Sequence, residues 1–187
     1  MVGIRSVRRS DLDERTLVEA ARRDPDAFAE LYRRHLPAVF RFAHRRSGSR
    51  TIAEDVTAAT FERALRNLPR FEWRPSGIRP WLCRIAANEL ADHHRRELRR
   101  SDREAVAGHA ADLATIDPSP SDPDDDVLAA LSVLRPRYQE VLALRYLADL
   151  DSEEVAAAVG ISRPHLAVLL RRARLALRRA IDQGGER

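Results

Sequence analysis

A stretch rich in aspartate and proline divides this chain into two parts, and it constrains the fold more than any other feature of the sequence. Residues 102–126 carry eight carboxylates against one arginine, a net charge of −7, together with Pro118, Pro120 and Pro123. Proline and clustered like charge disfavour a packed element, so this stretch predicts a solvated linker. A calcium-binding loop is the alternative, but the glycine and the distal glutamate of an EF-hand are missing from it.

The parts on either side of the linker both show helical patterning. Ile52, Val56 and Thr60 recur at intervals of four in the longer part, as do Leu166 and Leu170 in the shorter one. The chain has only 7 glycines and 5% aromatic residues, which argues against a sandwich or barrel. We therefore expect an all-α protein of two small helical domains joined by a flexible acidic linker. The expected division is residues 12–100, the linker at 101–126, and residues 127–182.

Capping residues predict where several of these helices begin and end. Asp24 followed by Pro25 is typical of a helix N-terminus, and Ser47–Gly48–Ser49 of a break between two helices. Pro80 suits the first turn of a further helix. The run from Asp151 to Glu154 has the spacing of a capping box, and Gly160 is expected to end the helix that the box begins.

All 33 cationic residues are arginine, and the chain contains no lysine. This absence excludes a P-loop, a Schiff-base lysine and the strand lysine of a kinase. The whole chain carries +4, so the residues outside the acidic stretch carry +11. Much of that charge lies in two segments, 93–100 and 163–179, on opposite sides of the linker. Either segment alone could be a solvated helix face, but the pair favours a polyanion that is contacted twice.

The residue types that usually carry catalysis or metal binding are not arranged for it in this sequence. Cys83 is the single cysteine, which excludes a disulfide framework and a zinc knuckle and suggests a reducing compartment. Glu54 and Asp55 are adjacent, so they point about 100° apart on a helix. His93 and His94 are adjacent too and lack the i, i+4 spacing of a helical zinc site. We expect no enzyme activity, no metal and no cofactor.

The sequence also lacks the signals of membrane insertion or secretion. No uncharged apolar run approaches the roughly 18 residues that a membrane span needs. The N-terminus has arginines but no apolar core of a signal peptide. We expect a cytoplasmic protein that associates with the nucleoid.

Residues 152–179 have the pattern of a helix-turn-helix: a short helix, a glycine-containing turn and a long basic helix. An apolar stripe from Leu166 to Leu177 would hold the long helix on its partner, which leaves an arginine-rich outer face for the major groove of DNA. A basic helix that only packs is the alternative. The candidate outer residues are Arg163, His165, Arg171, Arg174 and Arg178.

The first part of the chain has aromatic residues interleaved with arginine, a pattern suited to stacking on unpaired bases. Trp81 could equally belong to the core. On the helix that follows, Asn88 shares a face with Arg84, Arg95 and Arg99 at near i, i+4 spacing, which suits reading of base edges, although its amide could also satisfy local backbone groups. The aromatic residues are Phe71, Trp73 and Trp81, among Arg70, Arg74 and Arg79.

These motifs, in this order, resemble the sigma-70 family of RNA polymerase initiation factors. The runs DAFAELYRRHLPAVFRFAHRR, AEDVTAATFERAL and PWLCRIAANELADHHRR resemble region 2. The run LAALSVLRPRYQEVLALRYLADLDSEEVAAAVGIS, with the basic helix after it, resembles region 4. A chain with just these two regions and an acidic linker is similar to the extracytoplasmic-function (ECF) group.

The resemblance implies a sigma factor that binds core RNA polymerase, directs it to promoter DNA and helps to melt the minus-ten element. It also implies an anti-sigma factor that covers these faces. Polymerase contacts are expected from Glu54, Asp55, Thr57 and Phe61. Minus-ten contacts are expected from Phe71, Trp73, Arg79, Trp81, Arg84, Asn88, Arg95 and Arg96. Minus-thirty-five contacts are expected from Ser162, Arg163, His165, Ala167, Arg171, Arg172 and Arg174.

Three positions depart from the family pattern. Ala58–Ala59 stands where a Gln–Glu pair is usual in the docking helix, and Cys83 where an aromatic residue is common. Ala167–Val168–Leu169 stands where the last helix often has a basic residue, a small polar one and an arginine, so phosphate or thymine-methyl contacts should dominate there. The alternative function is a helix-turn-helix regulator that acts on duplex DNA without polymerase.

Overall fold

The N-terminal part of the chain is a helical bundle around an aliphatic core. A computed structural model describes residues 12–106 and 123–184. In its first part lie α1 (Glu14–Ala21), α2 (Pro25–Ser47), α3 (Arg50–Asn67), the 3-10 turn η2 (Leu68–Arg70) and α4 (Arg79–Val106). Leu17 of α1, Leu31 and Phe42 of α2, and Leu82 of α4 are all fully buried, so each of these helices turns an apolar face to the same core.

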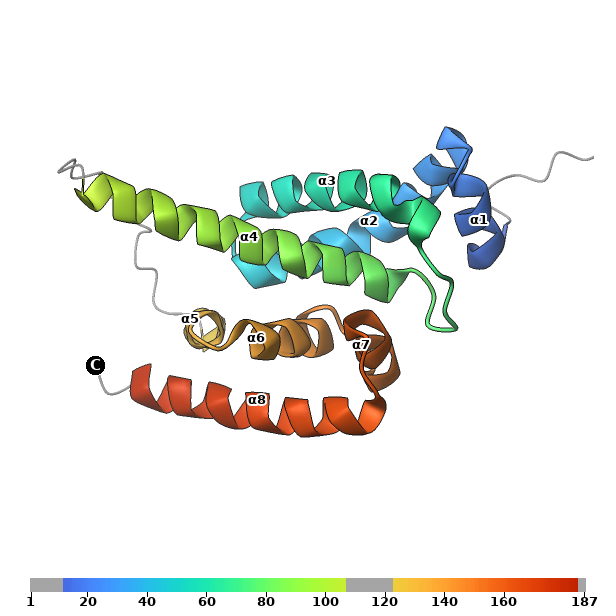
Figure 1. The fold of residues 1–187 in the computed structure, drawn as a ribbon. Helices are drawn as coiled ribbons and strands as arrows, with labels where there is room; N and C mark the ends of the chain where they lie inside the picture. The colour runs from blue at the N-terminus through green and yellow to red at the C-terminus, as the bar shows by residue number, and fades with distance from the viewer. Residues whose placement is uncertain (1–11, 107–122, 185–187) are drawn as a thin grey trace, which may run out of the picture.

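The C-terminal part is a second, smaller group of helices. It consists of α5 (Pro123–Ser132), α6 (Pro136–Leu142), the π-helical turn η3 (Ala143–Leu147), α7 (Ser152–Val159) and α8 (Arg163–Gly184). Val141, Leu144 and Leu166 are buried in its core. In Figure 1, α5 and α6 lie between α4 and α8, and α8 runs along the outside of the molecule.

The expected helix boundaries are confirmed. The side chain of Asp24 accepts a 3.0 Å hydrogen bond from the Asp26 N–H at the start of α2, and Pro25 occupies the first helical position. Gly48 ends α2 with a left-handed φ of 66°, a conformation that costs glycine nothing because it has no Cβ. The α4 helix begins at Arg79, one residue before Pro80.

The expectation of an all-α fold is confirmed for the described residues, whose elements are all helices or helical turns. The structure differs from the sequence analysis at both ends of the expected linker. The α4 helix continues to Val106 because residues 101–106 contain no glycine or proline to end it. The α5 helix begins at Pro123, whose fixed φ suits a first helical position. The rest of the expected linker, 107–122, lies outside the described residues. No described helix is both long enough and apolar enough to span a membrane.

The two helical groups pack against each other. The α4 helix contacts α6, η3 and α7, and α2 contacts η3. An ion pair of 2.9 Å joins Nη1 of Arg45 to Oδ2 of Asp149 across this interface. The first group therefore meets the second along α4, the helix that carries six of the eight residues expected to contact the minus-ten element.

Candidate nucleic-acid interface

The loop between η2 and α4 is held at both ends by α1. Nη2 of Arg22 donates a 2.6 Å hydrogen bond to the carbonyl oxygen of Phe71, where the loop begins. At the other end, the backbone N–H of Ile78 donates to Oε2 of Glu14 at 3.4 Å. Gly77 lies against the same carboxylate with a φ of 74°, so a larger residue there would be both strained and crowded. Sequence reasoning missed this role of Glu14 and Arg22 because neither belongs to a repeated pattern.

Glu14 is also expected to make stability depend on acid pH. Its Oε1 lies 3.0 Å from Nε2 of His35, and this contact holds the pKa of Glu14 below its ordinary value against the opposing effect of burial. A lowered folded-state pKa gives stability that is present above the unfolded pKa and lost as pH falls through the folded one. Because the carboxylate is partly exposed, Glu14→Gln should cost only about 0.5–1 kcal/mol at neutral pH.

Urea unfolding from pH 7 down to about pH 4 measures this cost, which should shrink below about pH 5 as Glu14 of the unfolded wild-type chain takes up a proton. The matched control is Glu19→Gln on the same helix, where Glu19 makes only an exposed contact of 3.4 Å with Arg22. A cost for Glu14→Gln that is the same at every pH would contradict the assigned contact.

An aromatic pair lies at the junction of the loop and α4. The ring centroids of Phe71 and Trp81 are 4.9 Å apart; Phe71 is buried and Trp81 is half-buried. Beside them is a cavity of about 210 Å³ between the loop and α7, lined among others by Trp81, Arg84 and Ala158. Trp81 thus packs in the protein, as the core interpretation expects, and it also lines an open cavity. Its stacking on unpaired bases stays a prediction.

Arginines of the loop and of α4 donate hydrogen bonds to backbone carbonyls of the C-terminal group. These bonds run from Arg74 to Ala157 (2.9 Å), from Arg84 to Ala158 (2.7 Å) and from Arg79 to Ala148 (2.6 Å). Ala157 and Ala158 lie in the last turn of α7, where carbonyls have no partner within the helix and carry a partial negative charge. These guanidinium groups therefore act as caps on the other module. Arg79 and Arg84 were predicted from sequence as minus-ten contacts, and none of the three arginines was predicted to bond to the other module.

The other residues predicted for the minus-ten contact are spread along the loop and α4. Trp73 is half-buried in the loop and Asn88 is exposed on α4. Arg95 pairs with the side chain of Asp92, and Nε of Arg96 donates to the backbone carbonyl of Asp92 at 3.2 Å. The structure thus brings Trp81 and Arg84 together at one cavity and places Asn88, Arg95 and Arg96 further along the helix.

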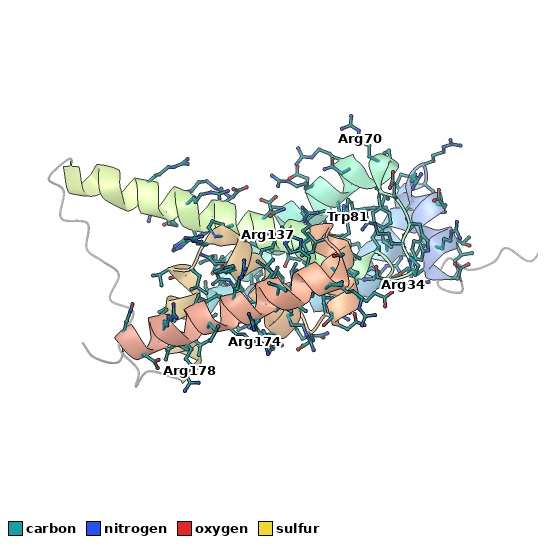
Figure 2. The ribbon with its side chains drawn as sticks, turned by 60° about the horizontal axis from the view of Figure 1, so that its bottom comes forward. Arg34, Arg70, Trp81, Arg137, Arg174 and Arg178 are labelled. Carbon is teal, nitrogen blue, oxygen red and sulfur yellow. The ribbon has the colours of Figure 1, made fainter. Side chains whose placement is uncertain are left out.

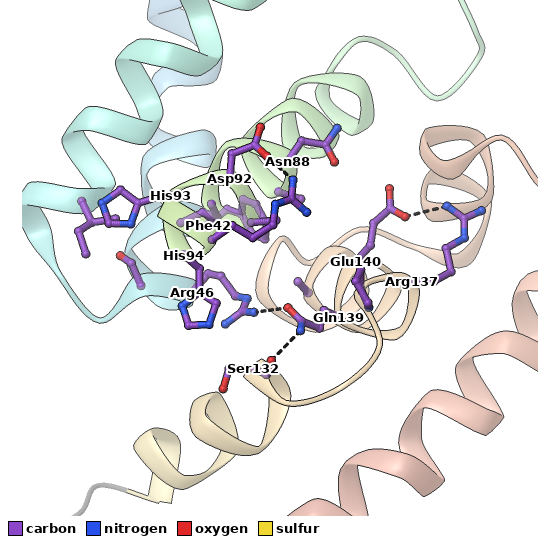
Figure 3. Close-up of a pocket in the computed structure, with 18 of the residues that line it drawn as sticks. Phe42, Arg46, Asn88, Asp92, His93, His94, Ser132, Arg137, Gln139 and Glu140 are labelled. Atoms are coloured by element: carbon purple, nitrogen blue, oxygen red, sulfur yellow. Dashed lines mark hydrogen bonds and ion pairs between the residues drawn. The ribbon is translucent and has the colours of Figure 1, made fainter. Parts of the chain in front are cut away.

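A larger cavity of about 730 Å³ lies between α2 and α4 on one side and α5 and α6 on the other (Figure 3). Nη2 of Arg46 donates a 3.1 Å hydrogen bond to Oε1 of Gln139, whose Nε2 in turn donates to the backbone carbonyl of Ser132 at 2.8 Å. Burial lowers the pKa of the Arg46 guanidinium from its ordinary value. His93 and His94 line this cavity, but within the described residues no three His, Cys, Asp or Glu side chains are placed to hold a metal.

The residues expected to contact polymerase divide into exposed and buried pairs on α3. Glu54 and Asp55 are exposed, whereas Thr57 and Phe61 are only 4% and 3% exposed. Thr57 and Phe61 therefore pack the helix into its core in this structure, and a partner would meet Glu54 and Asp55. Leu65 is 50% exposed on the same helix.

The expected helix-turn-helix is present in α7 and α8. Asp151 accepts from the backbone N–H groups of Glu153 and Glu154, and the Glu154 side chain accepts from the Asp151 N–H, which completes the capping box. Gly160 ends α7 with a left-handed φ of 70°. The hydroxyl of Ser162 then accepts a 3.4 Å hydrogen bond from the His165 N–H in the first turn of α8.

The α8 helix buries one face and leaves a basic one free. Leu166, Leu170 and Ala173 are buried against the module, and the arginines lie on the exposed remainder of the helix, as Figure 2 shows for Arg174 and Arg178. The exposed residues predicted from sequence are Ser162, Arg163, His165, Ala167, Arg171, Arg172 and Arg174. A basic face on the second helix of a helix-turn-helix is typical of DNA-binding proteins.

Cys83 lies in the core of α4 and is 1% exposed. Burial raises the pKa of its thiol to about 12, so the thiol stays protonated and unreactive at neutral pH. The position that departs from the family pattern is therefore occupied by a small packing residue.

Comparison with known sequences and structures places this architecture in a family. The profile described as Sigma-70 region 2 matches residues 31–100, and that described as Sigma-70, region 4 matches residues 124–177. The RNA polymerase sigma factor CarQ of Myxococcus xanthus is 37% identical over 139 residues, which cover 73% of this chain and 79% of CarQ. The chain belongs to the sigma-70 family of RNA polymerase sigma factors, in its ECF group.

Other relatives agree in sequence and in fold. The ECF sigma factor BldN of Streptomyces coelicolor is 33% identical over 81% of this chain, and the match covers 60% of BldN. The chain thus spans less than two thirds of that relative. The structure of CnrH in complex with the cytosolic domain of CnrY is similar over 91% of this chain and 97% of CnrH, at 28% identity and a TM-score of 0.61. The sigma factor RpoE of Bartonella quintana, in complex with the anti-sigma factor NepR, is similar over 83% of this chain and 96% of RpoE, at 25% identity and a TM-score of 0.54.

Proposed function

We propose that this chain binds core RNA polymerase, directs it to specific promoters and helps to melt the minus-ten element. The observation that carries the proposal is the pairing of two different nucleic-acid surfaces in one member of this family. The basic outer face of α8 suits duplex DNA, and the aromatic and arginine-rich loop before α4 suits unpaired bases. Unstacking of bases costs a few kcal/mol, which stacking on the loop and contacts with polymerase can offset.

Each surface has its own proposed task. Residues 12–100 would hold polymerase through Glu54 and Asp55 on α3 and would capture minus-ten bases with Trp81 and Arg84. Residues 127–182 would bind the minus-thirty-five element through α8. The acidic stretch at 101–126 would join them.

Promoter binding on this scheme requires the two modules to separate. Arg74, Arg79 and Arg84 donate to carbonyls of the C-terminal module, so they become available to DNA only when those hydrogen bonds break. The outer face of α8 needs no such change. We propose that duplex contact through α8 can come first and that polymerase then holds the modules apart.

An anti-sigma factor is a proposed partner, because the structural relatives CnrH and RpoE were solved in complex with CnrY and with an anti-sigma factor, respectively. We further propose that the chain has no catalytic chemistry of its own and acts in the cytoplasm at the nucleoid, where its partners core polymerase and promoter DNA are found. Polymerase supplies the chemistry of transcription.

The deciding experiment is reconstitution of the full chain with core RNA polymerase from its own host, followed by mapping of transcript 5′ ends on genomic DNA. We expect new start sites that share upstream motifs and that are absent with core enzyme alone. A chain that neither associates with core polymerase nor produces such starts would overturn the proposed function.

A helix-turn-helix regulator remains the second candidate, because the α8 face is already exposed with the modules packed together. A regulator should prefer fully paired DNA, whereas a sigma factor bound to core polymerase should prefer a fork with an unpaired minus-ten strand. A binding comparison on these two probes separates the candidates.

A further inference from the structure

The outer face of α8 carries a line of exposed apolar side chains that the protein does not bury. Val168 is 45% exposed and Leu175 is 54% exposed, on the side opposite Leu166 and Leu170. Residues seven apart lie on the same side of a helix, so Val168 and Leu175 form a ridge about 10 Å long. Nothing in the packing of the module explains why this line is apolar.

Arginines flank the ridge on both sides. Arg171 and Arg178 follow one side and Arg172 and Arg179 the other, each pair again seven residues apart. None of these four guanidinium groups makes a hydrogen bond or ion pair within residues 12–106 and 123–184. An apolar ridge between two rows of arginines is complementary to a partner that presents an apolar group between two rows of negative charge.

The major groove of duplex DNA has this arrangement. Phosphates border it on both sides, and the one apolar group that base pairs present there is the C5 methyl of thymine. Val168 lies in the second turn of the second helix of a helix-turn-helix, the part that enters the groove. Ala167 beside it is exposed as well and adds no hydrogen-bonding group.

We infer that Val168 is a specificity-determining residue that reads thymine methyl groups in the minus-thirty-five duplex, while the flanking arginines hold the phosphates. This inference rests on the proposed function, since it assigns what α8 recognises. An acidic protein surface with an apolar strip is the other conceivable occupant. Duplex DNA is favoured because the ridge belongs to a helix-turn-helix and its arginines form two rows rather than one cluster.

The test uses uracil, which pairs like thymine but lacks the methyl group. The full chain first selects duplexes from a randomised pool. Each thymine of a selected duplex is then replaced singly by deoxyuridine, and affinity is measured by fluorescence anisotropy. The loss of one buried methyl contact should weaken binding about fourfold at one or two positions.

Two variants test whether Val168 causes the weaker binding of the uracil duplexes. Val168→Ala should reduce the difference between the thymine and uracil duplexes, because its shorter side chain loses most of the contact with the methyl group. The variant should fold because alanine favours an exposed helix position. The matched control is Val133→Ala in the turn that follows α5, where Val133 is 76% exposed and far from the ridge in sequence; it should keep the wild-type preference for thymine.

The outcomes separate this inference from the proposed function. Equal binding of thymine and uracil duplexes by the wild-type chain would overturn the inference and leave the ridge to a protein partner, yet the chain could still direct polymerase to promoters. A thymine preference of unchanged size in Val168→Ala would also overturn the inference. A chain that selects no duplex and directs no transcription would overturn both.

Discussion

Replacement of Trp81 by alanine is expected to reduce the equilibrium constant for promoter melting by about 5- to 150-fold, because stacking of one unpaired base on an aromatic ring contributes about 1–3 kcal/mol. Trp81 lines the 210 Å³ cavity beside the loop between η2 and α4, and its ring centroid lies 4.9 Å from that of Phe71. The measurement is permanganate reactivity of unpaired thymines in complexes with the reconstituted holoenzyme.

Since Trp81 also packs in the protein, its variant needs controls for folding. Trp81→Phe keeps a ring in the cavity and should recover most of the melting. Binding of the minus-thirty-five duplex through α8 should be unchanged in Trp81→Ala, which separates lost base capture from lost structure. Normal melting by Trp81→Ala would remove this residue from the proposed base pocket.

Duplex binding by the full chain should weaken on the order of 10³-fold when salt rises from about 50 to 200 mM. This follows if about six arginines meet phosphates, because each phosphate contact releases counterions and steepens the salt dependence. Six arginines lie on α8, and the structure leaves them exposed: Arg163, Arg171, Arg172, Arg174, Arg178 and Arg179. Titrations at several salt concentrations give the slope of log affinity against log salt.

A double variant provides the matched test. Arg171→Gln with Arg178→Gln removes two charges from one side of the ridge and should reduce the slope by about 2. The same change at Arg66 and Arg70, which lie on the N-terminal module and away from α8, should leave the slope of minus-thirty-five binding nearly unaltered. A flat salt response in the wild-type chain would contradict an electrostatic role for α8.

The features that sequence could predict are those set by local chemistry. The capping box of Asp151 and Glu154, the left-handed Gly160 and the helical spacing of Leu166 and Leu170 each depend on a few neighbouring residues. Their physical consequences are the same in almost any protein, so helix boundaries and the free face of α8 followed from them. Family resemblance then supplied the tasks of those faces.

The features that sequence could not predict depend on contacts between distant residues. Arg74 and Ala157 are 83 residues apart, and no local pattern indicates that a guanidinium group on a loop will cap a helix of another module. The hydrogen bonds of Glu14 and Arg22 to the loop between η2 and α4 were missed for the same reason, since they too join residues far apart in the sequence. The burial of Phe61 could not be predicted, because an aromatic residue at this position of α3 is compatible both with the core and with a contact surface.

On the proposed function, promoter affinity depends on the fraction of molecules in which the arginine caps between the modules are broken. Only molecules in which Arg74, Arg79 and Arg84 have left their carbonyl partners can use those groups on DNA. If about 1% of free molecules are so arranged, apparent affinity at the minus-ten strand falls about 100-fold below the intrinsic value. A ligand that binds only the form with broken caps would raise the apparent affinity for the minus-ten strand by up to that 100-fold factor without contacting a base. A ligand that binds only the form with intact caps would lower the apparent affinity further.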